Sequence, residues 1–409
     1  MIYGLIGEHL GHSFSAVIHG QIGREPYELL ELAPQELETF LRDREFRGIN
    51  VTIPYKQAVI PCLDEVSETA REIGAVNTIV NREGRLVGDN TDLEGITKLI
   101  LRVCPDLKGR KTLVLGTGGT SRTAVYAARR LGADPVIRVS RTAREGAVSY
   151  ADALRDHRDA EIIINTTPCG MYPNSGEAPL ELEGFDRLAG VVDVIYNPLR
   201  TKLVLEARRR GIPAEGGLYM LVAQAVRAAE IFRNTEYPAE MTERIYRSLL
   251  REKENIVLTG MPGSGKSVVS AALEEITGRP AVDTDRLIVE KAGMEIPEIF
   301  RRFGEKHFRD LESEVIRELA PDGGRIISTG GGAVLRAENV EALRMNGRLF
   351  LLDRPLDELL PTDDRPLADS REKIERLYRE RTPVYRASAD EVVPVAGTPE
   401  NVAKEIISR

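Results

Sequence analysis

The stretch Asn255-Ile-Val-Leu-Thr-Gly260-Met-Pro-Gly-Ser-Gly265-Lys266-Ser267 places the spacing G-x-x-x-x-G-K-S directly after an apolar run. This spacing is typical of a phosphate loop, in which glycine backbone N–H groups surround the phosphates of a nucleotide. The side chain of Lys266 then reaches the β- and γ-phosphates, and the hydroxyl of Ser267 binds Mg²⁺. An apolar strand before the loop and a helical pattern after it predict an ATP-binding α/β domain, whose bounds we place at residues 253–409.

The rest of the chain is long enough for further domains, because 409 residues exceed one ordinary domain. Hydrophobic residues make up 42% and charged residues 29%, as in soluble globular proteins. The net charge is −8 and the basic residues are scattered among acidic ones, so no basic stripe indicates nucleic-acid binding. No apolar run approaches the roughly 18 residues that a membrane helix needs.

The cysteines and the N-terminus bear on the compartment. Cys62, Cys104 and Cys169 are far apart and form no C-x-x-C pair, so they predict neither a disulfide framework nor a zinc site. The N-terminal stretch Met1-Ile-Tyr-Gly-Leu-Ile-Gly lacks the basic region of a signal peptide. We therefore expect a cytoplasmic protein with small-molecule partners, no nucleic acid and no membrane. Whether it forms a homo-oligomer stays open.

Residues 1–95 alternate short apolar runs with helical patterns, which predicts an α/β unit with a largely parallel sheet. Polar clusters follow its strands: Gly11-His-Ser13-Phe-Ser15, Gly48-Ile-Asn50-Val-Thr52-Ile-Pro-Tyr-Lys56, Gly74-Ala-Val-Asn77-Thr and Gly88-Asp-Asn-Thr-Asp92. Taken singly, Ser13, Ser15 and Asp92 are more simply read as helix caps. Four clusters at the strand ends of one unit instead favour a site for one polyhydroxylated ligand.

Residues 96–217 contain a second nucleotide pattern, Gly116-Thr-Gly118-Gly119-Thr120-Ser121, after an apolar strand and before an alanine-rich helix. It matches only two glycines of G-x-G-x-x-G, and its context is what favours a pyrophosphate at the helix N-terminus. The next strand ends in Ser140-Arg141-Thr142-Ala-Arg144, without the acidic residue of an NAD site. Because guanidinium groups bind phosphates, these residues favour NADP; an exposed loop arginine is the alternative.

The first 250 residues or so resemble shikimate dehydrogenase. The resemblance rests on G-H-S-F-S, G-I-N-V-T-I-P-Y-K, G-A-V-N-T, G-D-N-T-D, G-T-G-G-T-S-R, S-R-T, N-T-T-P-C-G-M and G-G-L-Y-M-L-V-A-Q. It implies NADPH-dependent reduction of 3-dehydroshikimate by a two-lobed fold, with a shikimate-binding α/β lobe at 1–95 and 218–252 and a Rossmann NADP-binding lobe at 96–217. Tyr219 stands where the family more often has a smaller residue, and we expect it to alter the nicotinamide pocket.

The dehydrogenase resemblance also implies residue roles. Lys56 and Asp92 are the catalytic pair, because an ammonium can give a proton to the carbonyl oxygen that receives charge and a carboxylate keeps that ammonium oriented. The implied substrate-binding residues are Ser13, Ser15, Asn50, Thr52, Lys56, Asn77, Asp92, Tyr196 and Gln224. The implied NADP-binding residues are Gly116, Gly118, Gly119, Thr120, Ser121, Ser140, Arg141, Thr142, Arg144 and Gly217.

Downstream of the phosphate loop, Asp283 and Asp285 lie at i and i+2 and so on one side of a strand, where one can serve the metal and the other a hydroxyl. With the runs F-R-D-L-E, S-T-G-G-G, D-R-P-L and R-T-P-V-Y, this half resembles bacterial-type shikimate kinase, a P-loop domain with a parallel sheet. The stretch before Arg365 is shorter and more acidic than is usual in that family.

By that resemblance Asp285, Arg309, Gly331, Gly332 and Arg381 bind shikimate, and Asp285 accepts from the attacking hydroxyl. The implied ATP-binding residues are Gly263, Ser264, Gly265, Lys266, Ser267 and Arg365. Lys266 and Arg365 are also implied in catalysis, and Ser267 and Asp283 in holding Mg²⁺.

The two halves together predict a bifunctional enzyme, since the product of the first reaction is the substrate of the second. Two alternatives stay open. The first half prefers quinate or NAD, or one half is a catalytically inactive binding or regulatory module.

Overall fold

The computed structural model describes residues 3–11, 13–143, 146–359 and 370–409. The chain divides into two compact units, Met1–Leu249 (the first unit) and Leu250–Arg409 (the second unit). The boundary falls within helix α9 (Glu240–Lys253). The boundary predicted from sequence lies between residues 252 and 253, at the end of the same helix.

The first sheet of the first unit has the strand order β2-β1-β3-β5-β6-β4. Its strands are β1 (Tyr3–Gly7), β2 (Tyr27–Glu31), β3 (Gly48–Val51), β4 (Glu65–Val66), β5 (Thr78–Arg82) and β6 (Arg85–Asp89). The helices between them are α1 (Ser15–Ile22), α2 (Leu37–Asp43) and α3 (Glu68–Ile73). Strand β5 runs antiparallel to both β3 and β6. Its pairing with β6 follows from the tight turn of Glu83 and Gly84, whose φ values are 53° and 89°. The sequence analysis did not predict β6.

The second sheet has the order β12-β11-β10-β7-β8-β9, and all its pairings are parallel. Its strands are β7 (Thr112–Leu115), β8 (Val136–Ser140), β9 (Val148–Ser149), β10 (Ile162–Asn165), β11 (Gly190–Asp193) and β12 (Ala214–Glu215). Side chains alternate between its two faces: Val114 packs with α4 (Asp92–Val103) and α5 (Gly119–Arg130), while Leu113 packs with α6 (Tyr150–Asp156) and α7 (Lys202–Arg209). The sheet is doubly wound, and its strand order reverses at β7, where such folds bind dinucleotides.

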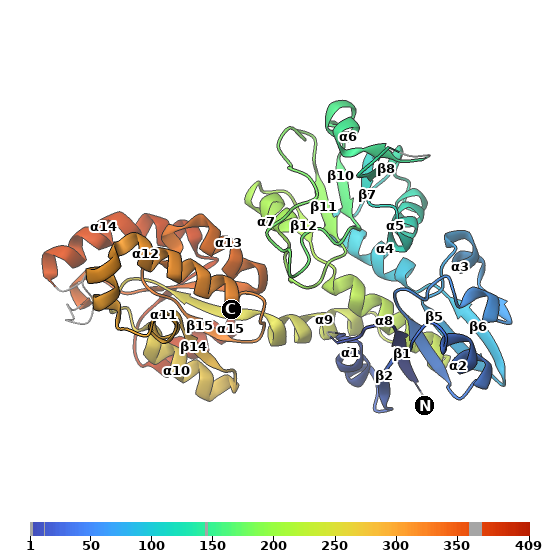
Figure 1. Cartoon of the computed structure of the whole chain (residues 1–409), viewed down its shortest axis with the longest axis horizontal. Coiled ribbons are helices and arrows are strands. Elements are labelled where there is room, and N and C mark those ends of the chain that lie inside the picture. The colour runs from blue at the N-terminus through green and yellow to red at the C-terminus, as the bar shows by residue number, and fades with distance from the viewer. Residues whose placement is uncertain (1–2, 12, 144–145, 360–369) are drawn as a thin grey trace. The chain divides into compact units, whose positions relative to one another are not determined.

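Helix α8 (Leu218–Arg233) begins after β12 and ends against the first sheet. Phe232 near its C-terminus stacks on Tyr3 of β1, with ring centroids 5.3 Å apart. Helix α8 therefore packs against both sheets of the first unit, along the line that Figure 1 shows from β12 towards β1.

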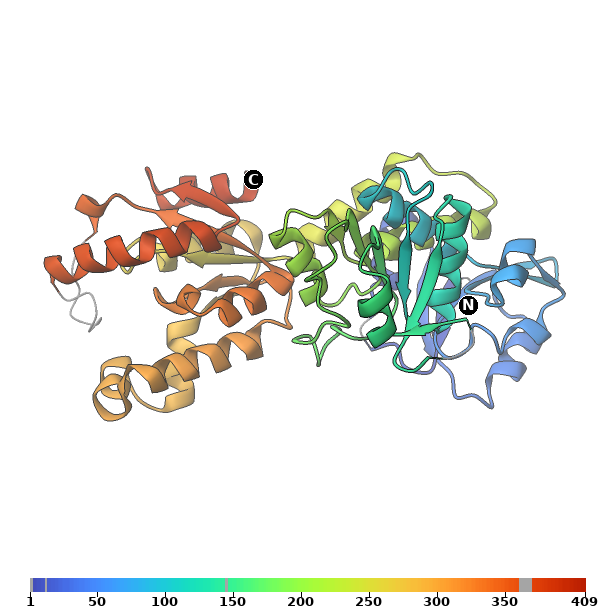
Figure 2. The same cartoon turned by 90° about the horizontal axis from the view of Figure 1, so that it is seen from above.

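The second unit is built on a five-stranded parallel sheet of order β14-β15-β13-β16-β17. Its strands are β13 (Asn255–Thr259), β14 (Ala281–Asp283), β15 (Ile326–Ser328), β16 (Gly347–Asp353) and β17 (Glu391–Pro394). Its helices are α10 (Lys266–Thr277), α11 (Thr284–Ala292), α12 (Ile296–Leu319), α13 (Ala337–Asn346), α14 (Arg371–Ser388) and α15 (Pro399–Ser408), and Figure 2 shows the sheet between them. The phosphate-loop stretch joins the central strand β13 to α10, as the sequence predicted.

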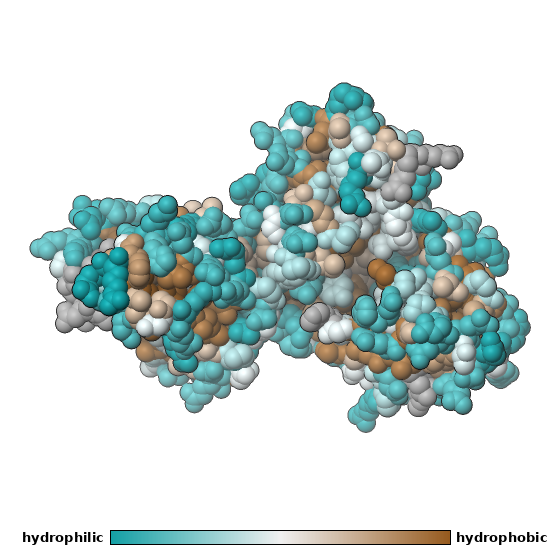
Figure 3. All heavy atoms as spheres, in the orientation of Figure 1, coloured by the Kyte–Doolittle hydropathy of each residue, from teal (hydrophilic) through white to brown (hydrophobic). Residues whose placement is uncertain are grey.

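The architecture confirms the predicted fold class: α/β, with two sheets in the first unit and a parallel sheet in the second. On the face drawn in Figure 3 the surface is mostly hydrophilic, with hydrophobic residues scattered over each unit. No helix among the described residues is both long and apolar enough to cross a membrane.

Gly48 of β3 gives a test of this packing. A Cβ atom at Gly48 would lie 2.7 Å from Cγ of the buried Phe232 ring, so Gly48→Ala forces the α8 ring away from the first sheet. We expect Gly48→Ala to lower the free energy of unfolding of the first unit by about 1–3 kcal/mol, measured by chemical denaturation. The control is Gly20→Ala in α1, because a Cβ atom there has no neighbour within 4 Å. Equal stability of the two variants would contradict the packing described.

Candidate active sites

A cavity of about 440 Å³ lies at the strand ends of the first unit. It brings together every substrate-binding residue predicted there and adds Thr120 and Gly217 from the predicted cofactor set. The predicted substrate residues that line it are Ser13, Ser15, Asn50, Thr52, Lys56, Asn77, Asp92, Tyr196 and Gln224. Four polar clusters separated along the sequence therefore do form one site.

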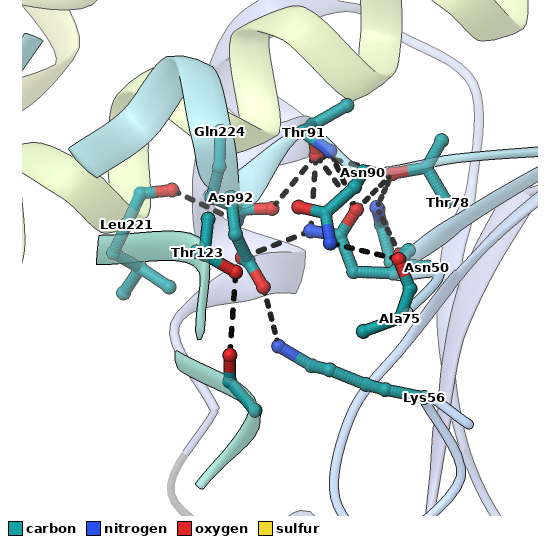
Figure 4. A network of polar contacts seen from close by, with 12 residues as sticks. Asn50, Lys56, Ala75, Thr78, Asn90, Thr91, Asp92, Thr123, Leu221 and Gln224 are labelled. Carbon is teal, nitrogen blue, oxygen red and sulfur yellow. Dashed lines mark hydrogen bonds and ion pairs between the residues drawn. The ribbon is translucent and has the colours of Figure 1, made fainter. Parts of the chain in front are cut away.

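Lys56 and Asp92 form an ion pair in this cavity, with Lys56 Nζ donating to Asp92 Oδ2 at 2.6 Å. Asn77 Nδ2 donates to the other carboxylate oxygen at 2.9 Å. Only 10% of the Asp92 side chain is exposed, which strengthens both interactions relative to water. Asp92 is the first residue of α4 and not its cap, which is Thr91, and both of its carboxylate oxygens have partners in the cavity (Figure 4).

A buried amide network holds Asn77 in this orientation. Its Oδ1 accepts from the backbone N–H of Thr91 at 2.7 Å and from the hydroxyl of Thr78 at 3.0 Å, so its Nδ2 must face Asp92. Asn50 Nδ2 donates to Thr78 Oγ1 at 3.1 Å, and the hydroxyl of Tyr27 donates to Asn50 Oδ1 at 2.8 Å. Figure 4 shows this chain of contacts leading from Asn50 to the ion pair.

Neither Ser13 nor Ser15 is the cap residue of α1, which is Phe14, although Ser13 makes a local hydrogen bond beside it. Ser13 Oγ accepts from the backbone N–H of Ser15 at 3.2 Å, at the start of α1. Both residues also line the cavity, and Ser15 is only 7% exposed. Ser13 therefore both stabilises the turn before α1 and lines the cavity.

The glycine turn after β7 fits a pyrophosphate. Gly116 has φ 108°, and a Cβ atom there would lie 2.8 Å from the hydroxyl oxygen of Thr166. Gly118 precedes α5 without any side-chain cap, and a Cβ atom at Gly118 or Gly119 would meet nothing within 4 Å. The first N–H groups of α5 therefore face open space, which suits an anion. Ser121 is buried and donates to Gly116 O at 2.7 Å, so its side chain stabilises the turn.

The predicted 2′-phosphate residues follow β8. Ser140 is buried and its hydroxyl donates to Thr142 O, while Arg141 and Thr142 are exposed. Arg144 lies outside the described residues. The exposed guanidinium of Arg141 is thus placed at the end of the strand next to the glycine turn, where Rossmann folds bind the adenosine ribose.

Tyr219 does not line the cavity. Its ring packs edge-on against Tyr246 of α9 at 5.2 Å, and the Arg102 guanidinium lies 4.6 Å from its centroid. Arg102 also donates to Glu243 of α9 at 2.9 Å. Tyr219 thus packs against Tyr246 of α9 and Arg102 of α4 and not in the cavity, and its effect on the nicotinamide pocket stays a prediction.

A larger cavity of about 690 Å³ lies in the second unit. Nearly all described residues predicted for ATP, Mg²⁺ and shikimate there line it: Gly263, Gly265, Lys266, Ser267, Asp283, Asp285, Arg309, Gly331, Gly332 and Arg381. The buried Ser264 does not line it, and Arg365 lies outside the described residues. The phosphate loop and the two basic side chains thus share one cavity.

The loop itself fits a nucleotide phosphate. Gly260, Gly263 and Gly265 all have positive φ, and Gly265 precedes α10 without a side-chain cap, so the N-terminus of α10 opens directly from the glycine loop. Lys266 Nζ donates to Gly260 O and Met261 O, each at 3.0 Å, which places it across the loop. Asp283 caps α11 through Oδ1, which accepts from Asp285 N at 2.9 Å.

The basic side chains are held by acids and by glycine carbonyls. Arg309 is 8% exposed and donates to Glu312 at 2.8 Å and to Glu305 at 3.2 Å. Burial raises the pKa of the Glu312 carboxyl although Arg309 opposes the shift. Arg381 donates to Gly331 O at 3.0 Å, and the Tyr385 hydroxyl donates to the same oxygen.

Comparison with known proteins follows the same division. The model of the shikimate dehydrogenase substrate binding domain matches residues 5–79, and that of shikimate kinase matches residues 262–409. The chain is 35% identical over 265 residues to the NADP⁺ shikimate dehydrogenase of Clostridium perfringens, covering 61% of this chain and 98% of that protein.

The chain belongs to the shikimate dehydrogenase family. Its second unit is a shikimate kinase domain, so the polypeptide is a dehydrogenase–kinase fusion that uses NADP(H) and ATP.

Two solved structures support the dehydrogenase assignment. A chorismate mutase/shikimate 5-dehydrogenase fusion protein from Clostridium acetobutylicum is 37% identical with a TM-score of 0.58, and the match covers 61% of this chain and 96% of that one. Shikimate 5-dehydrogenase from Thermus thermophilus in complex with NADP(H) and shikimate is 32% identical with a TM-score of 0.55, covering 61% and 99%.

Several residues that hold the side chains of the two cavities in place were not predicted from the sequence. In the dehydrogenase they are Tyr27, Thr78 and Thr91, and in the kinase they are Glu312 and Tyr385. A signal was present for the kinase pair, since Glu312 and Tyr385 stand three and four residues after the two site arginines and so on the same helix faces. For the dehydrogenase residues only the sheet pairing reveals the contact.

Gly332 allows a test of the kinase site. A Cβ atom at Gly332 would overlap the guanidinium of Arg309, which two acids hold in place. We expect Gly332→Ala to raise the kinase KM for shikimate by about tenfold or more, since displacing a paired buried charge costs about 1–3 kcal/mol. The KM for ATP and the dehydrogenase activity of the same chain are the controls. An unchanged KM for shikimate would contradict the role of Arg309.

Proposed function

We propose that the chain catalyses two consecutive steps: NADPH-dependent reduction of 3-dehydroshikimate to shikimate, and ATP-dependent phosphorylation of shikimate to shikimate 3-phosphate. The observation that carries the first step is the 2.6 Å contact between Lys56 Nζ and Asp92 Oδ2 in a cavity that Thr120 and Gly217 also line. For the second step it is Asp285, Arg309 and Arg381 in one cavity with the phosphate loop.

We also propose a role for each domain. We assign residues 1–95 and 218–252 to the shikimate-binding lobe, residues 96–217 to the NADP-binding lobe and residues 253–409 to the kinase. The first sheet with α8, the doubly wound second sheet and the parallel five-stranded sheet support these assignments.

In the dehydrogenase, Lys56 is the proton donor. Bound NADPH supplies the hydride to the carbonyl carbon. The Lys56 ammonium gives a proton to the carbonyl oxygen as charge develops there, and Asp92 keeps that ammonium charged and oriented. Asn77 prevents Asp92 from turning away. Ser13, Ser15 and Asn50 line the rest of the cavity, where hydroxyl and amide groups suit a ligand rich in hydroxyls and carboxylate.

In the kinase, positioning and charge neutralisation do most of the work. Arg309 and Arg381 hold the shikimate carboxylate, and Asp285 accepts the proton of the hydroxyl that attacks the terminal phosphate of ATP. Lys266 balances charge on that phosphate, and Ser267 and Asp283 would hold a Mg²⁺ ion, which would supply further positive charge to the phosphates. The N-terminus of α10, which follows three glycines and has no side-chain cap, suits the phosphates. Arg365, which lies outside the described residues, is proposed to contact the transferred phosphoryl group.

Lys56→Ala tests the proton-transfer role. We expect dehydrogenase turnover to fall by about 10²–10⁴-fold while shikimate affinity stays largely intact, because eight other predicted residues line the cavity. Steady-state kinetics and shikimate titration measure the two effects. Lys98→Ala, which removes an exposed lysine paired with Glu94 on α4, is the matched control. Near-normal turnover of the Lys56 variant would overturn the assignment.

The consecutive reactions are tested on the full chain with 3-dehydroshikimate, NADPH, ATP and Mg²⁺. We expect shikimate 3-phosphate to form, detected by mass spectrometry. Accumulation of shikimate alone would mean that the kinase half is inactive. Parallel assays with quinate and with NAD⁺ decide the substrate and cofactor alternatives, and we expect lower kcat/KM for both.

A further inference from the structure

The segment between β11 and α7, residues 194–200, carries Tyr196 into the shikimate cavity of the dehydrogenase. Its two ends are Asp193, the last residue of β11, and Thr201, the residue that caps α7. This segment has no regular secondary structure in which Tyr196 would be fixed. Its position therefore depends on what holds its ends.

Both ends are tied to the buried carboxylate of Asp193. The backbone N–H of Ile195 donates to Oδ1 at 3.0 Å, and the hydroxyl of Thr201 donates to Oδ2 at 2.7 Å. Thr201 Oγ1 also accepts from Val204 N at 3.4 Å, so the same hydroxyl begins α7. Asp193 has no exposed surface. The Asp193 carboxylate therefore holds the two ends of this segment together.

The carboxylate also joins the segment to the end of β10. Asn165 Nδ2 donates to both oxygens of Asp193, each at 3.1 Å. The amide orientation is not ambiguous, because Asn165 Oδ1 accepts from the backbone N–H of Thr167 at 3.0 Å. Burial raises the pKa of Asp193 to about 6 although these donors oppose the shift. At neutral pH the group is mostly the carboxylate that all four hydrogen bonds need.

The segment also packs closely against Gly216 and Gly217, where there is no space for a side chain. Gly217 N donates to Ile195 O at 2.7 Å, and a Cβ atom at Gly217 would overlap the carbonyl of Val194. A Cβ atom at Gly216 would lie 2.6 Å from Leu199 O. The segment is therefore confined between the Asp193 carboxylate and the backbone that leads into α8.

Tyr196 projects from this confined segment to the substrate-binding side. Its ring lies 5.5 Å from that of Phe14, at an angle of 54°. Phe14 stands between Ser13 and Ser15, which line the same cavity. The position of Tyr196 thus affects the cavity wall on both sides.

We propose that Asp193 is a positioning residue of the dehydrogenase: its buried carboxylate sets the place of Tyr196 and so the affinity of the cavity for shikimate. The proposal rests on the proposed function of the first unit. It assigns Asp193 no contact with substrate or cofactor.

The test compares Asp193→Asn, Tyr196→Phe and the double variant in the full chain. Asparagine keeps the shape of Asp193 but turns one acceptor into a donor, which cannot satisfy Asn165 and Thr201 as the carboxylate does. We expect the KM for shikimate in the Asp193→Asn variant to rise by about tenfold, equivalent to about 1.4 kcal/mol, with a smaller change in kcat. We expect the double variant to be no worse than the weaker-binding single variant.

Asp152→Asn is the matched control, because Asp152 accepts hydrogen bonds at the start of α6 and does not line the cavity. Kinase activity measures the amount of chain in each preparation, and chemical denaturation shows whether the first unit is folded. If Asp193→Asn does not fold, Thr201→Val takes its place, and Thr201→Ser, which keeps the hydroxyl, should restore the wild-type KM.

Each result supports or overturns the proposal. An unchanged KM in Asp193→Asn overturns it, as do strictly additive effects of Asp193→Asn and Tyr196→Phe, because Asp193 would then act independently of Tyr196. Failure of the wild-type chain to oxidise shikimate with NADP⁺ would instead overturn the proposed function.

Discussion

The ion pair between Lys56 and Asp92 depends on how the strands of the first sheet pair. The two residues are 36 positions apart, and a lysine and an aspartate that are both largely withdrawn from water need partners that do not move. Asn77 supplies one such partner, and Asn77 is itself oriented by Thr78 and Thr91. These residues meet because β5 pairs antiparallel with β6 and places Thr78 opposite Asp89. The hairpin turn at Glu83 and Gly84 is thus a structural requirement of the catalytic pair.

The kinase unit also contains a largely buried ion pair, in which the cation is an arginine. Arg309 is largely buried and therefore needs a counter-charge within the protein, which the buried Glu312 provides. The raised pKa of Glu312 shows that burial costs this carboxyl more than its arginine partner returns. The glycines that follow β15 (residues 330–332) are part of the same arrangement. The guanidinium of Arg309 occupies the space that a side chain at Gly332 would take. Small residues and buried charges are therefore parts of one site.

Each unit thus presents a cavity suited to a small polyhydroxylated carboxylate beside a nucleotide-binding turn. The positively charged groups differ in kind: an ammonium that can transfer a proton in the dehydrogenase, and guanidinium groups that remain protonated in the kinase. This difference matches the two chemistries, because a carbonyl reduction needs a proton donor and a phosphoryl transfer needs fixed positive charge.

The sequence by itself determined the fold class, both glycine turns and most of the polar residues that line the two cavities, because these depend on local patterns. A glycine turn after a strand, or a polar cluster at a strand end, keeps its meaning wherever the strand lies in the sheet. The tertiary structure alone decided which cap candidates serve the site. Asp92 pairs with Lys56, and Asp283 caps α11. Ser13 accepts a hydrogen bond at the start of α1 and also lines the cavity. It also decided the place of Tyr219, which packs on Tyr246, and the hydrogen bonds that Asp193 accepts. Such contacts join residues that are distant in sequence, and their geometry exists only after the helices have packed on the sheets.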